Sequence, residues 1–315
     1  MSTVPEEPAL ETGLELLDEP TLARVVTHGH RAPRSGWLGV GALIAESLSL
    51  RDHRIPATAT VAFGSGTRSE GPQWTSDVPV PAGGFAVLAG RTDDGHSTWT
   101  AYLADDLVTA PVALTPAMDV WGGHLLLVRD GARPLATVVD TVVVRPGLLS
   151  LPPGLLAIAA AGAHALGVAA RFRDAFLRKA ARSARGWAAV KTIDDPMVLS
   201  ILLTAEELLD GAAALLNARV RALIGDPDPG PGAWARLVLA GIGALDAACA
   251  ATTKVMTVTG ASALYDGNPM QESFAHLAAL SAHPLFDRPV RLLNQRAALE
   301  PDLDRLFTDD SGEAR

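Results

Sequence analysis

The stretch TGASALYDGNPMQESFAHLAALSAHPLF, Thr259 to Phe286, interrupts an alanine-rich helical region with a Gly-Ala-Ser bend and an Asn-Pro break. It also carries two histidines, His276 and His283, on the segment that follows the break. The Asn268-Pro269 break predicts that a new helix begins there, because proline is tolerated in the first helical turn. The stretch therefore predicts two helices that are joined by a polar bend.

Three longer helical patterns precede this bend. Apolar residues from Leu155 to Phe176 recur at three- and four-residue steps, which predicts a helix of about 25 residues. A second helix is expected to start at Pro196, which follows the capping acid Asp195, and a third runs from about Ala233 to Val258. Long helices with short connections favour antiparallel packing, so we expect a C-terminal up-down four-helix bundle.

The chain has a different pattern before residue 150. Short runs rich in Val, Thr and Leu alternate there with Gly, Pro and Asp, which is typical of a small β domain. The expected strands are Thr58–Phe63, Phe85–Ala89, Ser97–Leu103, His124–Val128 and Ala136–Arg145. Weak helical patterns cover Leu14–Val26 and Leu38–Leu50. The predicted fold class is α+β, with a short helical remnant over residues 1–50, the β domain over 51–149 and the bundle over 150–315.

Composition limits the classes of partner. The 315 residues include 26 Lys and Arg against 35 Asp and Glu, which gives a net charge of −9. This field repels phosphate, so we expect no nucleic-acid partner. The single cysteine, Cys249, excludes an intramolecular disulfide and a multi-cysteine metal site, and we expect it to be a small core residue.

Targeting signals are also weak. Acidic residues from Glu6 to Glu19 dominate the first twenty positions, which is the opposite of a secretory leader. Gly154–Ala170 approaches the length of a membrane span but is short of the roughly 20 residues required, and it is interrupted by His164. We expect a buried helix there, no membrane partner and a cytoplasmic location.

The bend carries a family resemblance. Gly260–Glu272, with the helix that follows and ends at His283, resembles the acyl-CoA dehydrogenase superfamily, in the branch that includes two-component flavin monooxygenases. The run Asp195-Pro196-Met197-Val198 also looks like its counterpart in that superfamily. The resemblance implies FAD or FMN as cofactor, a small organic or acyl-thioester substrate, and assembly into a homo-oligomer or a hetero-oligomer with a full-length homologue.

The resemblance also implies a set of site residues. His283 is the expected catalytic residue, as a hydrogen-bonding group beside the flavin. The residues expected to contact the cofactor are Gly260, Ser262, Asn268 and Arg185. The residues expected to contact the substrate are Tyr265 and His276. Each has a structural alternative: a histidine satisfied at a helix end, small residues at a close helix crossing, an arginine on a solvated face, and a tyrosine that seals the bundle.

Several departures from the family pattern leave two functions open. Glu272 stands where the superfamily has Arg, and no glutamate base accompanies His283 at the end of the helix. Much of the N-terminal helical domain is missing. One hypothesis is a flavin-dependent oxidoreductase that works without the usual Glu. The other is a degenerate, flavin-free homologue that serves as a partner subunit or catalyses a non-redox step such as cyclisation. No metal site is expected, because His276 and His283 lack a convergent ligand.

Overall fold

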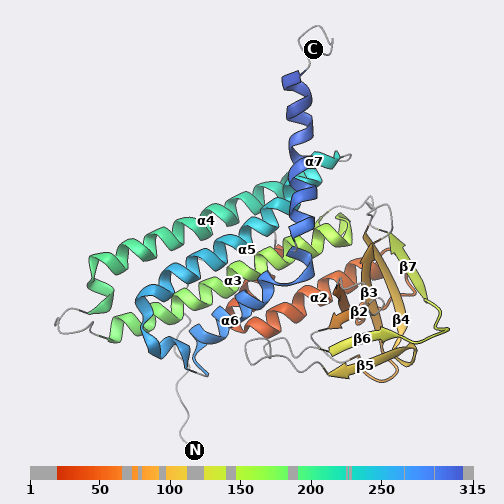
Figure 1. Cartoon of the computed structure of the whole chain (residues 1–315), viewed down its shortest axis with the longest axis horizontal. Coiled ribbons are helices and arrows are strands. Elements are labelled where there is room, and N and C mark those ends of the chain that lie inside the picture. Colours follow the sequence, from red (N-terminus) through yellow and green to blue (C-terminus); the bar gives the residue numbers. More distant parts are fainter. Residues whose placement is uncertain are drawn as a thin grey trace, which may run out of the picture.

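The computed structural model places a layer of long helices beside a β-sheet, and the sheet lies against one end of that layer (Figure 1). It describes residues 20–65, 73–76, 80–91, 97–111, 124–139, 147–183, 191–224, 226, 229–265, 267–286 and 288–307. This architecture confirms the predicted α+β class, in which a small β region leads into a C-terminal helical bundle.

Proline marks the start of most helices. The helices are α1 (Pro20–Arg31), α2 (Pro33–Ser49), α3 (Pro153–Arg182), α4 (Pro196–Ile224), α5 (Pro231–Thr259), α6 (Pro269–Ser281) and α7 (Arg288–Phe307). Proline suits this position because the first helical turn has no internal partner for its N–H groups. The expected bundle helices correspond to α3, α4, α5 and α6.

Helix α3 is the centre of the helical layer. Most of its residues are buried, and α1, α2, α5 and α6 pack around it. Glycines allow these contacts to be close: a Cβ on Gly162 would lie 2.7 Å from the Gly241 carbonyl oxygen of α5, and one on Gly167 would overlap Val26 of α1. Because α3 and α5 run parallel, their C-terminal ends meet, and the Lys179 ammonium donates to the Thr259 carbonyl oxygen.

One face of the sheet packs against the helical layer. Its strands are β1 (Thr60–Ser65), β2 (Gln73–Ser76), β3 (Phe85–Arg91), β4 (Ser97–Leu103), β5 (Leu107–Pro111), β6 (His124–Val128) and β7 (Ala136–Val139). They lie in the order β5-β6-β2-β1-β3-β4-β7, with β1 and β3 parallel and the other pairs antiparallel. Successive side chains of β1 point to opposite faces of the sheet. Val61 and Phe63 therefore join the core that the sheet shares with the helices, whereas Ala62 joins a smaller cluster on the other face.

Among the residues that the structure describes, two helices are long and apolar enough to cross a membrane, α3 and α5. Within the most apolar windows of these helices, 89% of α3 and 61% of α5 is buried inside the protein. Burial of this kind is what the core helix of a bundle requires. The sequence predicts a buried helix at the α3 segment, and the structure agrees with this prediction.

Candidate functional site

Helix α6 separates the predicted site residues into three groups. The bend lies before its first residue, His276 lies within it, and His283 follows its last turn. At 1.5 Å per residue, the 13 residues of α6 span about 20 Å. The bend and His283 therefore do not line one common pocket within a single chain.

The bend exposes two large side chains and ends in a residue that caps α6. Gly260 ends α5 with φ 73° and ψ 167°, and a short 3₁₀ turn follows over Ala261–Leu264. The Asn268 side chain accepts from the Met270 N–H at 2.9 Å and so caps α6. Leu264 and Tyr265 are 61% and 70% exposed. Tyr265 therefore does not seal the bundle.

The middle of α6 carries a buried histidine pair. His276 Nε2 lies 2.7 Å from Nε2 of His164 on α3, and both residues are nearly inaccessible to solvent. Burial lowers the pKa of His276 to about 4. Burial also lowers the pKa of His164 well below its ordinary value, and the neighbouring His276 lowers it further. Both rings are therefore neutral near pH 7, so one Nε2 donates to the other. His276 thus packs α6 against α3.

Two glycines bring the corner between α1 and α2 onto the His164 ring. A Cβ on Gly29 or on Gly36 would lie 2.8 Å from His164 Nδ1. The close approach at Gly36 sets the position of Trp37, which follows it in the sequence. The ring centroid of Trp37 lies 5.8 Å from that of His164. The histidine pair and the glycines therefore support the aromatic side chain that faces His283.

His283 lies in an aromatic enclosure at the other end of α6. Its ring meets Trp37 of α2 at a centroid distance of 5.0 Å and Phe63 of β1 at 4.7 Å, both in edge-to-face geometry. The Leu285 N–H donates to His283 Nδ1 at 3.2 Å, which leaves the proton of the neutral ring on Nε2. Although the residue keeps some exposure, burial lowers its pKa to about 3.

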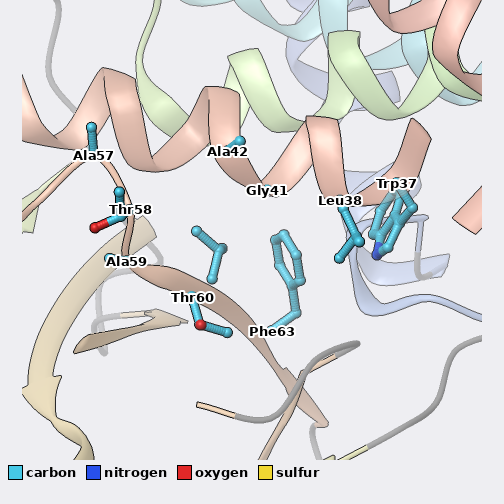
Figure 2. Close-up of a pocket in the computed structure, with 10 residues that line it drawn as sticks. Trp37, Leu38, Gly41, Ala42, Ala57, Thr58, Ala59, Thr60 and Phe63 are labelled. Atoms are coloured by element: carbon cyan, nitrogen blue, oxygen red, sulfur yellow. The ribbon is translucent and has the colours of Figure 1, made fainter. Parts of the chain in front are cut away.

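A half-open pocket adjoins this enclosure, between α2 and β1. It has a volume of about 180 Å³ and shares Trp37 and Phe63 with the surroundings of His283. Figure 2 shows Trp37, Leu38 and Ala42 on the α2 side and Phe63 on the strand that faces them. The Phe63 ring stands in the gap between the helix and the strand, so one aromatic residue borders both the pocket and the histidine.

Charged residues near α3 form ion pairs and do not line this pocket. Glu272 stands where the family pattern has Arg, and its carboxylate pairs with Arg171 of α3 at 3.0 Å. The negative charge at this position is therefore balanced by a cation on α3. Asp174 is buried and bonded to His30 at 2.8 Å. Burial raises the pKa of Asp174, but the His30 and Arg173 contacts outweigh it and the pKa is lowered.

The structure thus distributes the predicted residues unevenly. His283 has an enclosed setting beside a pocket, His276 takes part in helix packing, and Gly260, Asn268 and Tyr265 lie at the opposite end of α6. Arg185 and the side chain of Ser262 lie outside the described residues. Sequence reasoning missed the aromatic partners Trp37 and Phe63 and the histidine partner His164. The glycines around Trp37 were the available signal, since they indicate a close backbone approach.

Comparison with known proteins identifies the fold. Residues 159–288 match the family model "Acyl-CoA dehydrogenase, C-terminal domain". The helical bundle is therefore similar to the C-terminal domain of acyl-CoA dehydrogenases. A comparison of the sequence with curated proteins finds no significant match.

Solved structures with the acyl-CoA dehydrogenase fold resemble most of the chain. XiaF from Streptomyces sp., determined with FADH2 and glycerol, has a TM-score of 0.68 at 15% identity, with 94% of this chain and 83% of XiaF covered. The 3-HSA hydroxylase from Rhodococcus sp. RHA1 has a TM-score of 0.68 at 18% identity, covering 92% and 84%. Butyryl-CoA dehydrogenase from Megasphaera elsdenii has a TM-score of 0.63 at 12% identity, covering 89% and 81%. The chain therefore shares its fold with flavin-dependent oxidoreductases.

The described residues match one part of a flavin. Trp37 and Phe63 offer planar apolar surfaces, and His283 offers an N–H donor, which suit the edge of an isoalloxazine ring. The pocket alone, at about 180 Å³, is smaller than the roughly 300–1,000 Å³ usual for ligand sites. No charged side chain is among the residues that line it, so any contact to flavin phosphates would come from elsewhere.

Proposed function

We propose that the chain is a flavin-dependent oxidoreductase that works without a carboxylate base and uses His283 as a hydrogen-bond donor. The supporting observation is the setting of His283: its Nδ1 accepts from the Leu285 N–H, and its ring is enclosed by Trp37 and Phe63. FAD or FMN, when bound, would supply the electron-transfer chemistry. The residues of this chain would orient the reacting groups and exclude water.

The low pKa of His283 decides between two kinds of reaction. A general base works best when its pKa lies near the operating pH. His283, with a pKa lowered to about 3, is too weak a base to remove an α-proton from an acyl-thioester. Its Nε2–H can still donate a hydrogen bond in a water-poor setting, where such bonds are stronger. We therefore favour an oxygen-transfer reaction on a small organic substrate over acyl-thioester dehydrogenation.

Flavin binding is the direct test of this proposal. The purified chain is titrated with FAD and FMN, oxidised and then reduced under anaerobic conditions, and flavin absorbance and fluorescence are recorded. We expect saturable binding in wild type, and weaker binding in His283→Ala. His53→Ala, which changes an exposed histidine in the loop before β1, is the control and should behave as wild type. Absence of binding in both redox states would refute the proposal.

A second function is favoured by the outer surface of α4. This helix packs mainly against α5, and large apolar side chains on its other side are exposed. They are Met197, Leu199, Leu203 and Leu215. An unpaired apolar helix face of this kind is typical of a subunit contact. We therefore keep as the alternative a flavin-free chain that acts as the partner subunit of a complete homologue or catalyses a non-redox step.

Association and activity separate the two functions. Light scattering at micromolar concentration tests whether the chain forms a dimer, and Leu203→Glu should weaken such a contact. The partner-subunit function predicts activity only when the chain is mixed with a full-length homologue, and no flavin in the isolated chain. Flavin bound by the isolated chain would contradict this alternative.

A further inference from the structure

The pocket between α2 and β1 has the size and lining of a binding site for a small neutral molecule. Its volume is about 180 Å³. For comparison, an engineered apolar cavity of about 150 Å³ in another protein holds benzene. The pocket can therefore hold one six-membered ring with a small substituent, but not two fused rings together with a chain.

The lining of the pocket favours neutral molecules over charged ones. The residues that line it are Trp37, Leu38, Gly41, Ala42, Ala57, Thr58, Ala59, Thr60, Val61 and Phe63. None of them carries a charge, so a carboxylate or phosphate would lose its hydration without gaining a partner.

Gly41 creates part of this space. It lies on α2 within the pocket wall, and a Cβ built on it would meet no heavy atom within 4 Å. Glycine in a helix costs about 1 kcal/mol relative to alanine, so any larger residue here would favour the helix. A position that leaves open space at a cost to stability is what a binding pocket requires.

We propose that the pocket bounded by Gly41, Trp37 and Phe63 binds a neutral, largely apolar molecule of about one six-membered ring. This inference rests on the proposed function, because it names the substrate class of the same site. The ligand lies against the Trp37 and Phe63 rings, which also contact His283. A whole coenzyme A thioester does not fit within this volume, so at most its acyl part could enter the pocket.

Ligand-observed NMR on the whole chain without flavin tests the class of ligand. The probes are cyclohexanol, toluene and hexanoate, which have similar sizes but differ in polarity and charge. We expect saturable binding of cyclohexanol and toluene, and hexanoate at least about tenfold weaker. Hexanoate that binds as tightly as cyclohexanol, or no saturable binding of either neutral probe, would overturn the proposal.

Two glycine variants locate the binding. Gly41→Leu fills the pocket, whereas Gly39→Leu places the same side chain on α2 at another position with open space that does not line the pocket. Both variants should melt at or above the wild-type temperature because leucine favours a helix more than glycine does. We expect cyclohexanol binding to fall at least about tenfold in Gly41→Leu and to stay within about twofold in Gly39→Leu. Equal effects in the two variants, or none in Gly41→Leu, would place the ligand elsewhere.

Because these measurements need no flavin, probe binding without flavin binding would refute only the proposed function. Flavin binding without probe binding would refute only the pocket assignment.

Discussion

The two ends of α6 differ in how the chain surrounds them. At the N-terminal end, the bend exposes Tyr265, and the Asn268 side chain accepts from the Met270 N–H. At the C-terminal end, His283 meets aromatic rings from α2 and β1. The motif that resembles the flavoenzyme family covers both ends, but within one chain only the second has the enclosed, water-poor setting that chemistry requires. A sequence motif can therefore mark a fold without marking a single site.

The largest contrast between the two ends should appear on removal of an aromatic side chain. Trp37, on the His283 side, is 3% exposed, so Trp37→Ala should lower the free energy of unfolding by about 3–5 kcal/mol. Tyr265→Ala, at the bend, should change it by no more than about 0.5 kcal/mol. Urea unfolding of both variants measures the difference. Similar losses would mean that the bend is also packed in solution, against a second subunit for example.

The next largest effect should be a loss of stability in acid, caused by the buried His276 of α6. The pKa of His276 is lowered to about 4, against about 6.5 in the unfolded chain, so only the unfolded state binds this proton as the pH falls below 6.5. The free energy of unfolding should therefore drop between pH 6.5 and 4, by about 2 kcal/mol for this residue at pH 5, and stay level above pH 7.

A double variant isolates the contribution of the pair. His164→Leu combined with His276→Leu removes both titrating rings, so the acid-dependent loss of stability should become shallower. Urea midpoints at pH 5, 6 and 7 report the slope. An unchanged slope would assign the acid sensitivity to other groups.

Gly260 gives a smaller effect, confined to the bend. Its φ of 73° and ψ of 167° lie in a region that residues with a side chain rarely occupy, so Gly260→Ala should cost about 1–3 kcal/mol although open space surrounds the position. The matched control is Gly211→Ala within α4, which also meets open space and should stabilise by about 0.5–1 kcal/mol. Thermal unfolding of the pair gives changes of opposite sign, and a stabilising Gly260→Ala would contradict the observed conformation.

The smallest effect is expected at the cap of α6. Asn268→Ala removes the acceptor for the Met270 N–H and should cost about 1 kcal/mol, whereas Asn268→Asp keeps the acceptor and should cost less. Differential scanning calorimetry distinguishes the two. If the two variants lose the same stability, the amide has a role beyond capping, as the predicted cofactor contact would require.

Local signals predicted the helical part of the fold well. The start of α4 at Pro196 was predicted, and the structure shows why: the Asp195 carboxylate accepts from the Met197 N–H. Strands β4 and β6 also have the predicted bounds. These features depend on residues that are neighbours in the sequence, which is why pattern and capping rules suffice for them.

Other elements depend on distant partners and were missed or misplaced. Strands β2 and β5 have 4 and 5 residues, too few for a clear alternating pattern, and antiparallel pairing with β6 defines both. Helix α1 continues to Arg31, beyond the predicted end at Val26, whereas residues 14–19 of that prediction lie outside the described residues. Helix α7 was not predicted. Both make contacts with bundle helices that lie far away in the sequence.

The candidate site shows the same limit. His283 was predicted from a motif, but its partners Trp37 and Phe63 precede it by more than two hundred residues and follow no shared pattern. The position of His276 opposite His164 depends on how α6 lies across α3, which no local rule gives. The sequence thus indicates which residue to examine, whereas its surroundings come from tertiary packing.

The parallel course of α3 and α5 has an electrostatic consequence. Each helix carries roughly half a negative charge at its C-terminus, from carbonyl groups that no later turn can satisfy. Two such termini meet at the same end of the bundle and repel each other. The ammonium of Lys179, bonded to the last carbonyl of α5, supplies a positive charge between them and lets two aligned macrodipoles lie side by side.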